Sequence, residues 1–460
     1  LSLVHSKNLI LHDYDNPQAS HILDATIQND LLIVSGWIGG IEFYDISNPE
    51  ILNHLDNLQL SSGGGGGGTK ANCIVTSGNY AYVTTNQGLG IINISNPSNP
   101  QYLGIVSGTD GYILENLDIY ENFLAVAAHE DGVLFYDISD PDDPEYIETY
   151  QTMNAWAVKL EAFPNHPNYD FVIYVASQDY VDVGAYMYDN NNYIFSPIDY
   201  IDLGDAVKDI AYDNGLVYFA KGTGGVDVYL TEGTLDAGDS TLNCSMHIPC
   251  YLDNYNTSVL ANRIEILDDK LAVADWDDIE ILQWDGENLN LVGYKNTTRR
   301  TMAVATKDNY IYSAEWAAVQ IFEFGEVSGP DIDLSAYELN YPFVENGNSY
   351  TLSLDVTNNG NSILILNEAY VTNDEFSVSQ LENLNPGETQ TIDIVYTADS
   401  ANASGSYRIY SNDSDEPEVL CETNGNIIGA NVGDQAPDFN LDIVANGNGS
   451  FQLSDHIGQV

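Results

Sequence analysis

The feature that most constrains this chain is a phrase repeated three times near its start. The copies read IEFYDISNPE at 41–50, LGIINISNPSNPQYL at 89–103 and GVLFYDISDPDDPEYI at 132–147, roughly 45 residues apart. Upstream of each copy lie two short apolar strands joined by a polar turn, so one repeat predicts four strands. A period of about 40–50 residues with four strands is typical of a β-propeller, in which each repeat forms one blade.

Four weaker copies extend the pattern to residue 324. They read VIYVASQDYVDVGAYMYD, LVYFAKGTGGVDVYL, KLAVADWDDIEILQW and YIYSAEWAAVQIFEF, which makes seven repeats, and no segment has a convincing helical period. The last repeat, 301–324, has only three strands, whereas 2–11 forms a strand outside any repeat. We predict an all-β, seven-bladed propeller over 1–328, whose N-terminal strand completes the last blade and removes an exposed edge.

The repeated phrase also carries a family resemblance. The YDISNP-type phrase and the glycine-led apolar strand before it resemble the LVIVD-repeat family of bacterial β-propellers, over about 1–327 of the chain. This resemblance implies a role at the cell surface and names no substrate.

Beyond Gly329 the composition changes and the propeller phrase stops. The segment 331–428 alternates strands and turns, with NNGNSIL, NPGE and SNDSDEP at intervals. These motifs resemble immunoglobulin-like and Hydin-like domains of bacterial surface proteins, and seven short strands fit a sandwich of about 100 residues. We expect an immunoglobulin-like β-sandwich over 329–429.

The tail, 430–460, resembles the opening of redoxins with a thioredoxin fold. The matching residues are Gly433, Ala436, Pro437, Asp438, Phe439, Leu453, Ser454, Asp455, Gly458 and Val460. The chain stops before the reactive cysteine or CxxC motif of that family, so we expect a truncated redoxin-like start with no redox chemistry of its own.

The charge balance excludes several function classes. The chain holds 69 Asp and Glu against 12 Lys and Arg, a formal charge of −57, which repels nucleic acid and anionic membranes. No apolar run reaches the roughly 20 residues of a membrane helix, and the start at Leu1 indicates a mature or trimmed chain. A cell-surface or extracellular setting, in salty or calcium-bearing water, suits this composition.

The four cysteines fit an oxidising compartment. Cys244 and Cys250 lie close together in a loop-like stretch, and we expect them to form a disulfide. Cys73 and Cys421 lie in predicted strands and are expected to be buried free thiols.

Aligning the repeats gives a candidate ligand site. One position, just past each second strand, is filled by Trp37, Asn86, His129, Gln178, Gly222, Trp276 and Trp316. Trp276, Trp316 and Trp37 come from blades that are neighbours in a closed ring, so they could form a stacking platform for a sugar or an aromatic group. The alternative is that these indoles pack between blades.

The scarce basic residues are also unevenly placed. Six of them fall in or just before predicted innermost strands: Lys70, Lys159, Lys208, Arg263, Arg299 and Arg300. They could bind an anion such as a carboxylate or sulfate at a positive channel mouth, or they could merely neutralise crowded acidic residues.

Acidic clusters offer oxygen ligands suited to calcium. The candidates are Asp140, Asp142 and Asp143 in one turn and Asp275, Asp277 and Asp278 in another, and neither cluster has EF-hand spacing. The alternative is that such turns are only solvated.

No motif in the sequence singles out a catalytic centre. The eight histidines have no metal-ligand spacing, and the glycine run at 63–68 lacks the Lys-Ser/Thr of a P-loop and indicates a flexible loop. The leading hypothesis is a secreted or surface-attached binding and scaffold protein with a protein or glycan partner. The alternatives are the non-catalytic front of an extracellular thiol redox enzyme, and a structural subunit of a homo-oligomeric or larger extracellular assembly.

Overall fold

The computed structural model describes residues 6–60, 69–163, 169–189, 192–236, 241–325, 329–399, 403–413, 417–426, 440–442 and 450–452. Every regular element in these ranges is a β-strand. Within the same ranges, no helix has the length and apolarity needed to cross a membrane. The chain divides into two compact units, unit 1 (Leu1–Gly325) and unit 2 (Glu326–Val460), which are described separately.

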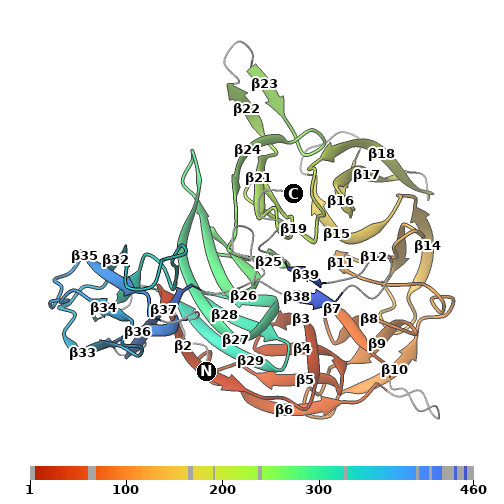
Figure 1. Cartoon of the computed structure of the whole chain (residues 1–460). Helices are drawn as coiled ribbons and strands as arrows, with labels where there is room; N and C mark the ends of the chain where they lie inside the picture. Colours follow the sequence, from red (N-terminus) through yellow and green to blue (C-terminus); the bar gives the residue numbers. More distant parts are fainter. Residues whose placement is uncertain are drawn as a thin grey trace. The chain divides into compact units, whose positions relative to one another are not determined.

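Unit 1 contains five four-stranded antiparallel sheets that follow one another along the chain (Figure 1). The first sheet has β3 (Ser20–Gln28), β4 (Leu31–Ile38), β5 (Gly40–Asp45) and β6 (Asn53–Leu58). The second has β7 (Ala71–Ser77), β8 (Tyr80–Thr85), β9 (Gly88–Asn93) and β10 (Gln101–Ile105). The third has β11 (Leu117–Tyr120), β12 (Phe123–Ala127), β13 (Val133–Asp137) and β14 (Glu145–Tyr150).

The next two sheets repeat this order. The fourth has β15 (Ala155–Ala162), β16 (Phe171–Ser177), β17 (Tyr180–Asp189) and β18 (Asn192–Asp202). The fifth has β19 (Asp209–Asp213), β20 (Leu216–Ala220), β21 (Val226–Leu230) and β24 (Cys250–Tyr255). Between β21 and β24 the chain forms a separate hairpin of β22 (Gly233–Asp236) and β23 (Thr241–Cys244).

The last sheet of unit 1 is larger and joins both ends of the unit. It contains β1 (Ser6–Lys7), β2 (Leu9–Asp15), β25 (Arg263–Leu267), β26 (Lys270–Trp284), β27 (Leu289–Lys307), β28 (Tyr310–Glu315) and β29 (Ala318–Phe324). The long strands β26 and β27 pair in two stretches separated by a register shift. The N-terminal strand β2 runs antiparallel to β29, with Leu9 opposite Phe324.

The first strands of the repeats lie side by side around the middle of unit 1 (Figure 1). In chain order, β3 contacts β7, β7 contacts β11, β11 contacts β15, β15 contacts β19, β19 contacts β25 and β25 contacts β27. The long strand β27 also contacts β3, which brings the end of the repeat region back to its start.

The repeated phrase has a structural reason. Its Asp or Asn side chain accepts a hydrogen bond from the backbone N–H two residues on, at 2.9 Å for Asp45, 3.0 Å for Asn93 and 2.8 Å for Asp137. This is an Asx turn, which ends the third strand. The isoleucine that follows this Asp or Asn, such as Ile46, is buried. Its N–H donates to the carbonyl oxygen of Asp30, in the turn before the second strand. The phrase thus fixes the third strand to the first hairpin of its own sheet.

Burial separates the strands within a sheet. The middle strands are buried on both faces, as in β5, where five successive residues are buried, whereas the fourth strand β6 is exposed or half-buried. Each hydrophobic core lies between neighbouring sheets: Phe43 of the first sheet, for instance, shares a core with Val83 of the second. Because each sheet is covered on both faces by its neighbours, its inner strands are almost wholly apolar.

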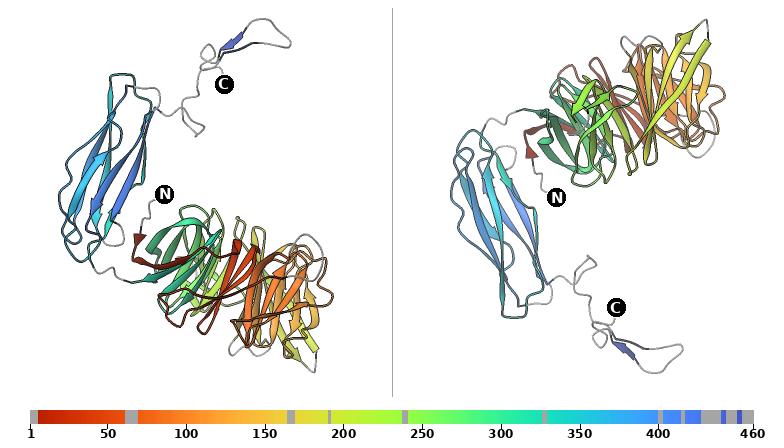
Figure 2. Two further views of the ribbon diagram at one scale, coloured as in Figure 1. Left: turned by 90° about the horizontal axis from the view of Figure 1, so that it is seen from below. Right: turned by 90° about the horizontal axis from the view of Figure 1, so that it is seen from above.

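Unit 2 consists of two four-stranded sheets around one core (Figure 2). One sheet contains β30 (Ile332–Leu334), β32 (Ser349–Asn358), β35 (Thr389–Thr397) and β34 (Phe376–Val378). The other contains β31 (Glu338–Asn340), β37 (Glu418–Gly425), β36 (Ala403–Ser411) and β33 (Leu366–Val371). These eight strands exceed the expected seven because the short strand β31 joins β37 in a parallel pair. A further two-stranded sheet pairs β38 (Asn440–Asp442) with β39 (Ser450–Gln452).

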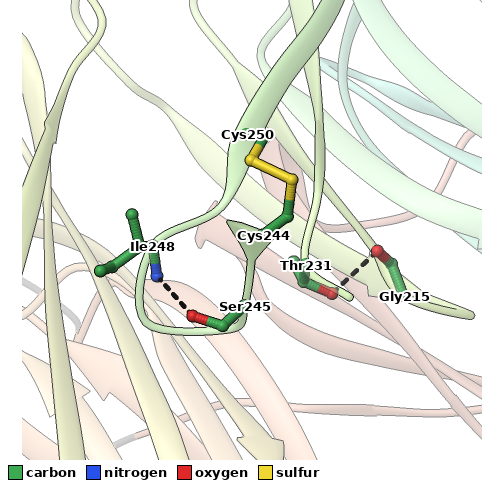
Figure 3. The surroundings of a disulfide bond; sticks show 6 residues. All are labelled: Gly215, Thr231, Cys244, Ser245, Ile248 and Cys250. Atoms are coloured by element: carbon green, nitrogen blue, oxygen red, sulfur yellow. Dashed lines mark hydrogen bonds between the residues drawn. A yellow bond between two sulfur atoms is a disulfide. The ribbon is translucent and has the colours of Figure 1, made fainter. Parts of the chain in front are cut away.

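The cysteines divide into one disulfide and two free thiols. Cys244 and Cys250 are bonded, with their Cα atoms 5.4 Å apart, across a turn closed by hydrogen bonds between Ser245 and Ile248 (Figure 3). The bond ties the β22–β23 hairpin to the start of β24. Cys73 and Cys421 are buried and form no disulfide.

Candidate functional site

The aligned position past each second strand lies at one end of the sheets of unit 1, the end where the first strands begin. Three of the residues at this position have a left-handed backbone conformation, with φ of 49° at His129, 59° at Gln178 and 57° at Trp276. Backbone hydrogen bonds join this position to the next first strand, as from His129 N to Ala155 O at 3.0 Å and from His21 N to Trp316 O at 2.7 Å. This end therefore gathers side chains from successive sheets.

Four half-buried indoles at this end each face a cation. The set, which we call the tryptophan rim, comprises Trp37, Trp156, Trp276 and Trp316. Lys70 Nζ lies 4.9 Å from the ring centroid of Trp37, and Lys208 Nζ lies 5.1 Å from that of Trp156. The guanidinium of Arg300 lies 4.7 Å from Trp276 and 5.6 Å from Trp316. Such distances are those of cation–π pairs.

Two of the three predicted indoles come together. Trp276 and Trp316 share Arg300, and His21 packs on Trp316 with ring centroids 4.3 Å apart. Trp37 pairs with Lys70 instead, so its recorded contacts do not join it to the other two. Sequence alignment missed Trp156, because it lies in a first strand; its signal was the neighbouring His129, whose ring packs on it at 4.6 Å.

The predicted basic residues separate into two groups. Arg299 and Arg300 are exposed at the rim, and Lys70 and Lys208 are half-buried there. Arg263 instead lies in a cavity of about 140 Å³ at the middle of unit 1, lined by all the first strands from β3 to β27. Its Nη1 is 3.5 Å from Asp209 Oδ1 and its Nη2 donates to Cys73 Sγ at 2.6 Å.

The central cavity balances acids with cations. Its charged lining consists of Asp24, Asp118, Asp209, Glu265, Lys159 and Arg263. Lys159 Nζ is 3.3 Å from Asp118 Oδ2. Desolvation within the cavity raises the pKa of Asp24 to about 6 and that of Glu265 to about 7, against the attraction of Arg263 and Lys159 respectively. Here the cations compensate carboxylates, which is the second of the two predicted roles.

Three of these carboxylates also join neighbouring sheets. Asp24 Oδ2 accepts the N–H of Ile74 at 2.9 Å, Asp118 Oδ2 accepts that of Leu160 at 2.7 Å, and Asp209 Oδ2 accepts that of Ile264 at 3.0 Å. In each case the acid and the donor lie on successive first strands. The acids of the cavity therefore have a structural use, because they satisfy backbone donors between sheets.

A second buried acidic group lies beside the rim, on β26. One carboxylate oxygen from each of Asp275, Asp278 and Glu280 lies within 4.8 Å of the others, and the three residues are 0%, 6% and 3% exposed. A break in the strand explains why they meet. The left-handed residue Trp276 and the register shift before Asp278 reset the alternation of β26, so Asp275 joins the face of Asp278 and Glu280.

The donors to this group are few. Ser258 Oγ donates to Asp275 Oδ2 at 2.7 Å and contacts Asp278 Oδ2 at 3.3 Å, and Ser258 N donates to Glu280 Oε1 at 3.1 Å. Val259 N adds one bond to Asp275 at 2.7 Å. The remaining oxygens, Asp275 Oδ1, Asp278 Oδ1 and Glu280 Oε2, are buried and have no hydrogen-bond partner among the described residues.

Burial and mutual repulsion disturb the protonation of this group. Burial, followed by the charges of Glu280 and Asp275, raises the pKa of Asp278 to about 9. Burial and the charge of Asp275 raise the pKa of Glu280 to about 8. The charges that act on Glu280 come from other carboxylates, Asp275 and Asp277. The site therefore concentrates negative charge, and no lysine or arginine of the described residues forms an ion pair with it, unlike the acids of the central cavity.

The predicted calcium ligands have different positions. Asp275 and Asp278 lie in the buried group, whereas Asp277 between them is exposed because the break in β26 turns it outward. Glu280 was missed, although its spacing of two from Asp278 places both on one strand face. Asp140, Asp142 and Asp143 are all exposed, and within the described residues they belong to no group of side chains close enough to share a metal ion.

Two sequence features lie outside the described residues. They are the glycine run at 63–68 and the matching positions of the redoxin-like tail, from Gly433 to Val460.

Comparison with known proteins identifies the repeats. The LVIVD repeat matches residues 68–107 and 114–152, which span β7 to β10 and β11 to β14, so that one matched repeat covers one four-stranded sheet. No curated protein matches the chain.

Two of the solved structures that resemble this chain have low sequence identity to it. One is the computationally designed Ika8 protein, with a TM-score of 0.46 and 14% identity, covering 68% of this chain and 99% of that one. Another is a chain of the mitotic checkpoint complex, with a TM-score of 0.49 and 10% identity, covering 68% of this chain and 91% of that one. The chain is thus an all-β protein that contains LVIVD repeats, a β-propeller repeat.

Proposed function

We propose that unit 1 is a seven-bladed β-propeller that recognises an anionic glycan outside the cell, through the tryptophan rim, with unit 2 as an immunoglobulin-like spacer. Two facts support seven blades. The first strands contact one another in a complete cycle from β3 to β27 and back, and β2 supplies a fourth strand beside β27, β28 and β29. The large sheet then counts as two blades joined through β26 and β27.

The observation that carries the proposed function is the placing of cations on indoles at the rim. In a chain with 12 Lys and Arg against 69 acidic residues, Lys70, Lys208, Arg299 and Arg300 gather at this one end of the sheets. An indole offers an apolar face to the C–H groups of a sugar ring, and a guanidinium beside it binds a carboxylate or sulfate. Together they fit an acidic sugar better than a neutral one.

The surrounding charge supports specificity rather than general anion binding. The net charge of −57 repels large polyanions, so binding depends on the local cations of the rim. A rigid ring with side chains from successive sheets at one end is well suited to recognition.

The test is calorimetric titration of the whole chain with oligogalacturonate, beside a neutral cello-oligosaccharide of equal length. We expect Arg300→Ala to weaken oligogalacturonate binding by about tenfold or more, because it removes the cation shared by Trp276 and Trp316. Lys270→Ala is the matched control, since Lys270 stacks on Phe324, 5.4 Å away, at the start of β26 and away from Trp276.

Three results would count against the proposal. They are the absence of oligogalacturonate binding, equal affinity for the neutral sugar, and equal losses in the Arg300 and Lys270 variants. Added salt should weaken the binding of the acidic sugar and leave that of the neutral sugar unchanged, because it screens the charge of the exposed guanidinium.

A further inference from the structure

We propose that the carboxylates of Asp275, Asp278 and Glu280 bind one calcium ion beside the tryptophan rim. The binding of this ion does not depend on a glycan, so the inference goes beyond the proposed function.

The spacing of the oxygens fits an ion in their midst. Calcium binds oxygen ligands at about 2.3–2.6 Å, so two ligands on opposite sides of the ion are up to about 5 Å apart. The three carboxylates bring oxygens within 4.8 Å of one another. Three carboxylates, each binding through one or two oxygens, supply three to six of the six to eight ligands that calcium takes.

The unpartnered atoms are an independent sign of a missing partner. Buried polar atoms in folded proteins nearly always have a hydrogen-bond partner, and buried charges are paired or bind metals. Asp275 Oδ1, Asp278 Oδ1 and Glu280 Oε2 have no such partner, and the hydroxyl of Thr257, next to Ser258, is also buried without one. A cation would satisfy the three carboxylate oxygens at once.

The local backbone is arranged for these carboxylates rather than against them. Ser258 and Val259, on the connection from β24 to β25, direct two N–H groups and one hydroxyl at Asp275, Asp278 and Glu280. These donors fix one oxygen of a carboxylate and leave the other available, which is how outer hydrogen bonds orient metal ligands.

The chemistry favours calcium over magnesium. Magnesium keeps several water molecules and demands an octahedral site, whereas calcium accepts direct, bidentate carboxylates in irregular geometry. The carboxylates here are 0–6% exposed, which leaves little room for a shell of water.

Competing protons give the site a measurable signature. Because burial and the neighbouring carboxylates raise the pKa values of Asp278 and Glu280 above their ordinary range, protons compete with calcium for these oxygens. Calcium must displace these protons, so its binding tightens as the pH rises and releases protons to the buffer.

The experiment is calorimetric titration of the chelator-treated full chain with CaCl₂ at constant ionic strength. Wild type is compared with Glu280→Gln and Asp278→Asn, which remove ligands, and with Asp277→Asn, which removes the same charge from an exposed neighbour. Far-ultraviolet circular dichroism checks that each variant is folded. Repeating the titration in buffers of different ionisation enthalpy counts the protons released.

We expect one calcium ion per chain, with proton release, in wild type and in Asp277→Asn. Each ligand variant should lose affinity by more than the roughly 10–100-fold that removal of an outer-shell partner costs. The proposal is overturned if wild type binds no calcium, if magnesium binds as tightly, or if the folded ligand variants bind as wild type does.

Discussion

Unit 1 groups carboxylates in two places and balances their charge in different ways. In the central cavity, Arg263 lies beside Asp209 and Lys159 beside Asp118. Beside the tryptophan rim, Asp275, Asp278 and Glu280 accept hydrogen bonds from a hydroxyl and from N–H groups, but no lysine or arginine in the described part of the chain pairs with them. A buried acid is tolerated only with compensation, so the difference suggests permanent, structural balance in one place and balance by a bound ion in the other.

The largest effect should come from removing the cation of the cavity. Arg263→Ala leaves the half-buried Asp209 and Asp24 without their guanidinium, and we expect unfolding in urea to show a loss of about 2 kcal/mol or more. Lys307→Ala, which removes an exposed pair with Asp30, should cost less than about 1 kcal/mol. Similar losses for the two variants would mean that the cavity acids need no compensation.

Asp278→Asn should have opposite effects with and without calcium. In chelator at neutral pH it replaces a carboxyl group that must take up a proton on folding with a neutral amide, so the melting temperature of unit 1 should rise above that of wild type. In calcium it removes a ligand, so the variant should melt below wild type. Calorimetric scans in chelator and in calcium measure the two differences in melting temperature between the variant and wild type. A variant that melts lower in both would show that Asp278 is only a packing residue.

The pH dependence should separate the two groups further. The folded pKa values of Asp278, about 9, and Glu280, about 8, lie above the ordinary values of 3.8 and 4.5. The folded state therefore holds protons that the unfolded state has lost, and stability falls as the pH rises from about 4 to about 9, by at most ~1.4 kcal/mol per pH unit for each group. Calcium should flatten this slope. An equal slope in Asp278→Asn without calcium would assign the dependence to Asp24 and Glu265 instead.

The smallest effect should come from the exposed acidic turn. Asp142→Asn removes a charge next to Asp140 and Asp143, and we expect it to change neither calcium binding nor, by more than about 0.5 kcal/mol, stability. A clear loss of calcium binding in this variant would show that acidic density alone, without burial, makes the site.

Much of the fold could be predicted from the sequence because each repeat contains the residues that form its own turn. The Asx turn at Asp45 and the buried Ile46 recur in the phrase, and they mark the third strand wherever they appear. The pairing of the N-terminal strand with the last repeat also followed from counting strands, since 301–324 supplies only three.

The sites were harder to predict because they depend on breaks in the pattern. The alternation of β26 is reset at Trp276, so Asp278 is buried and Asp277 exposed, whereas unbroken alternation from the buried Asp275 would bury Asp277 and expose Asp278. Whether a basic residue serves a ligand or a neighbouring acid depends on contacts between strands distant in sequence, as for Arg263 and Asp209. Neither the break in β26 nor the pairing of Arg263 with Asp209 can be predicted from amino-acid composition.

The most direct test of the comparison is a crystal structure of the full chain grown in calcium, with anomalous data. The predicted result is a peak about 2.3–2.6 Å from oxygens of Asp275, Asp278 and Glu280, with no peak in the central cavity. The contradicting result is three carboxyl groups that share protons through direct hydrogen bonds to one another, with no ion among them.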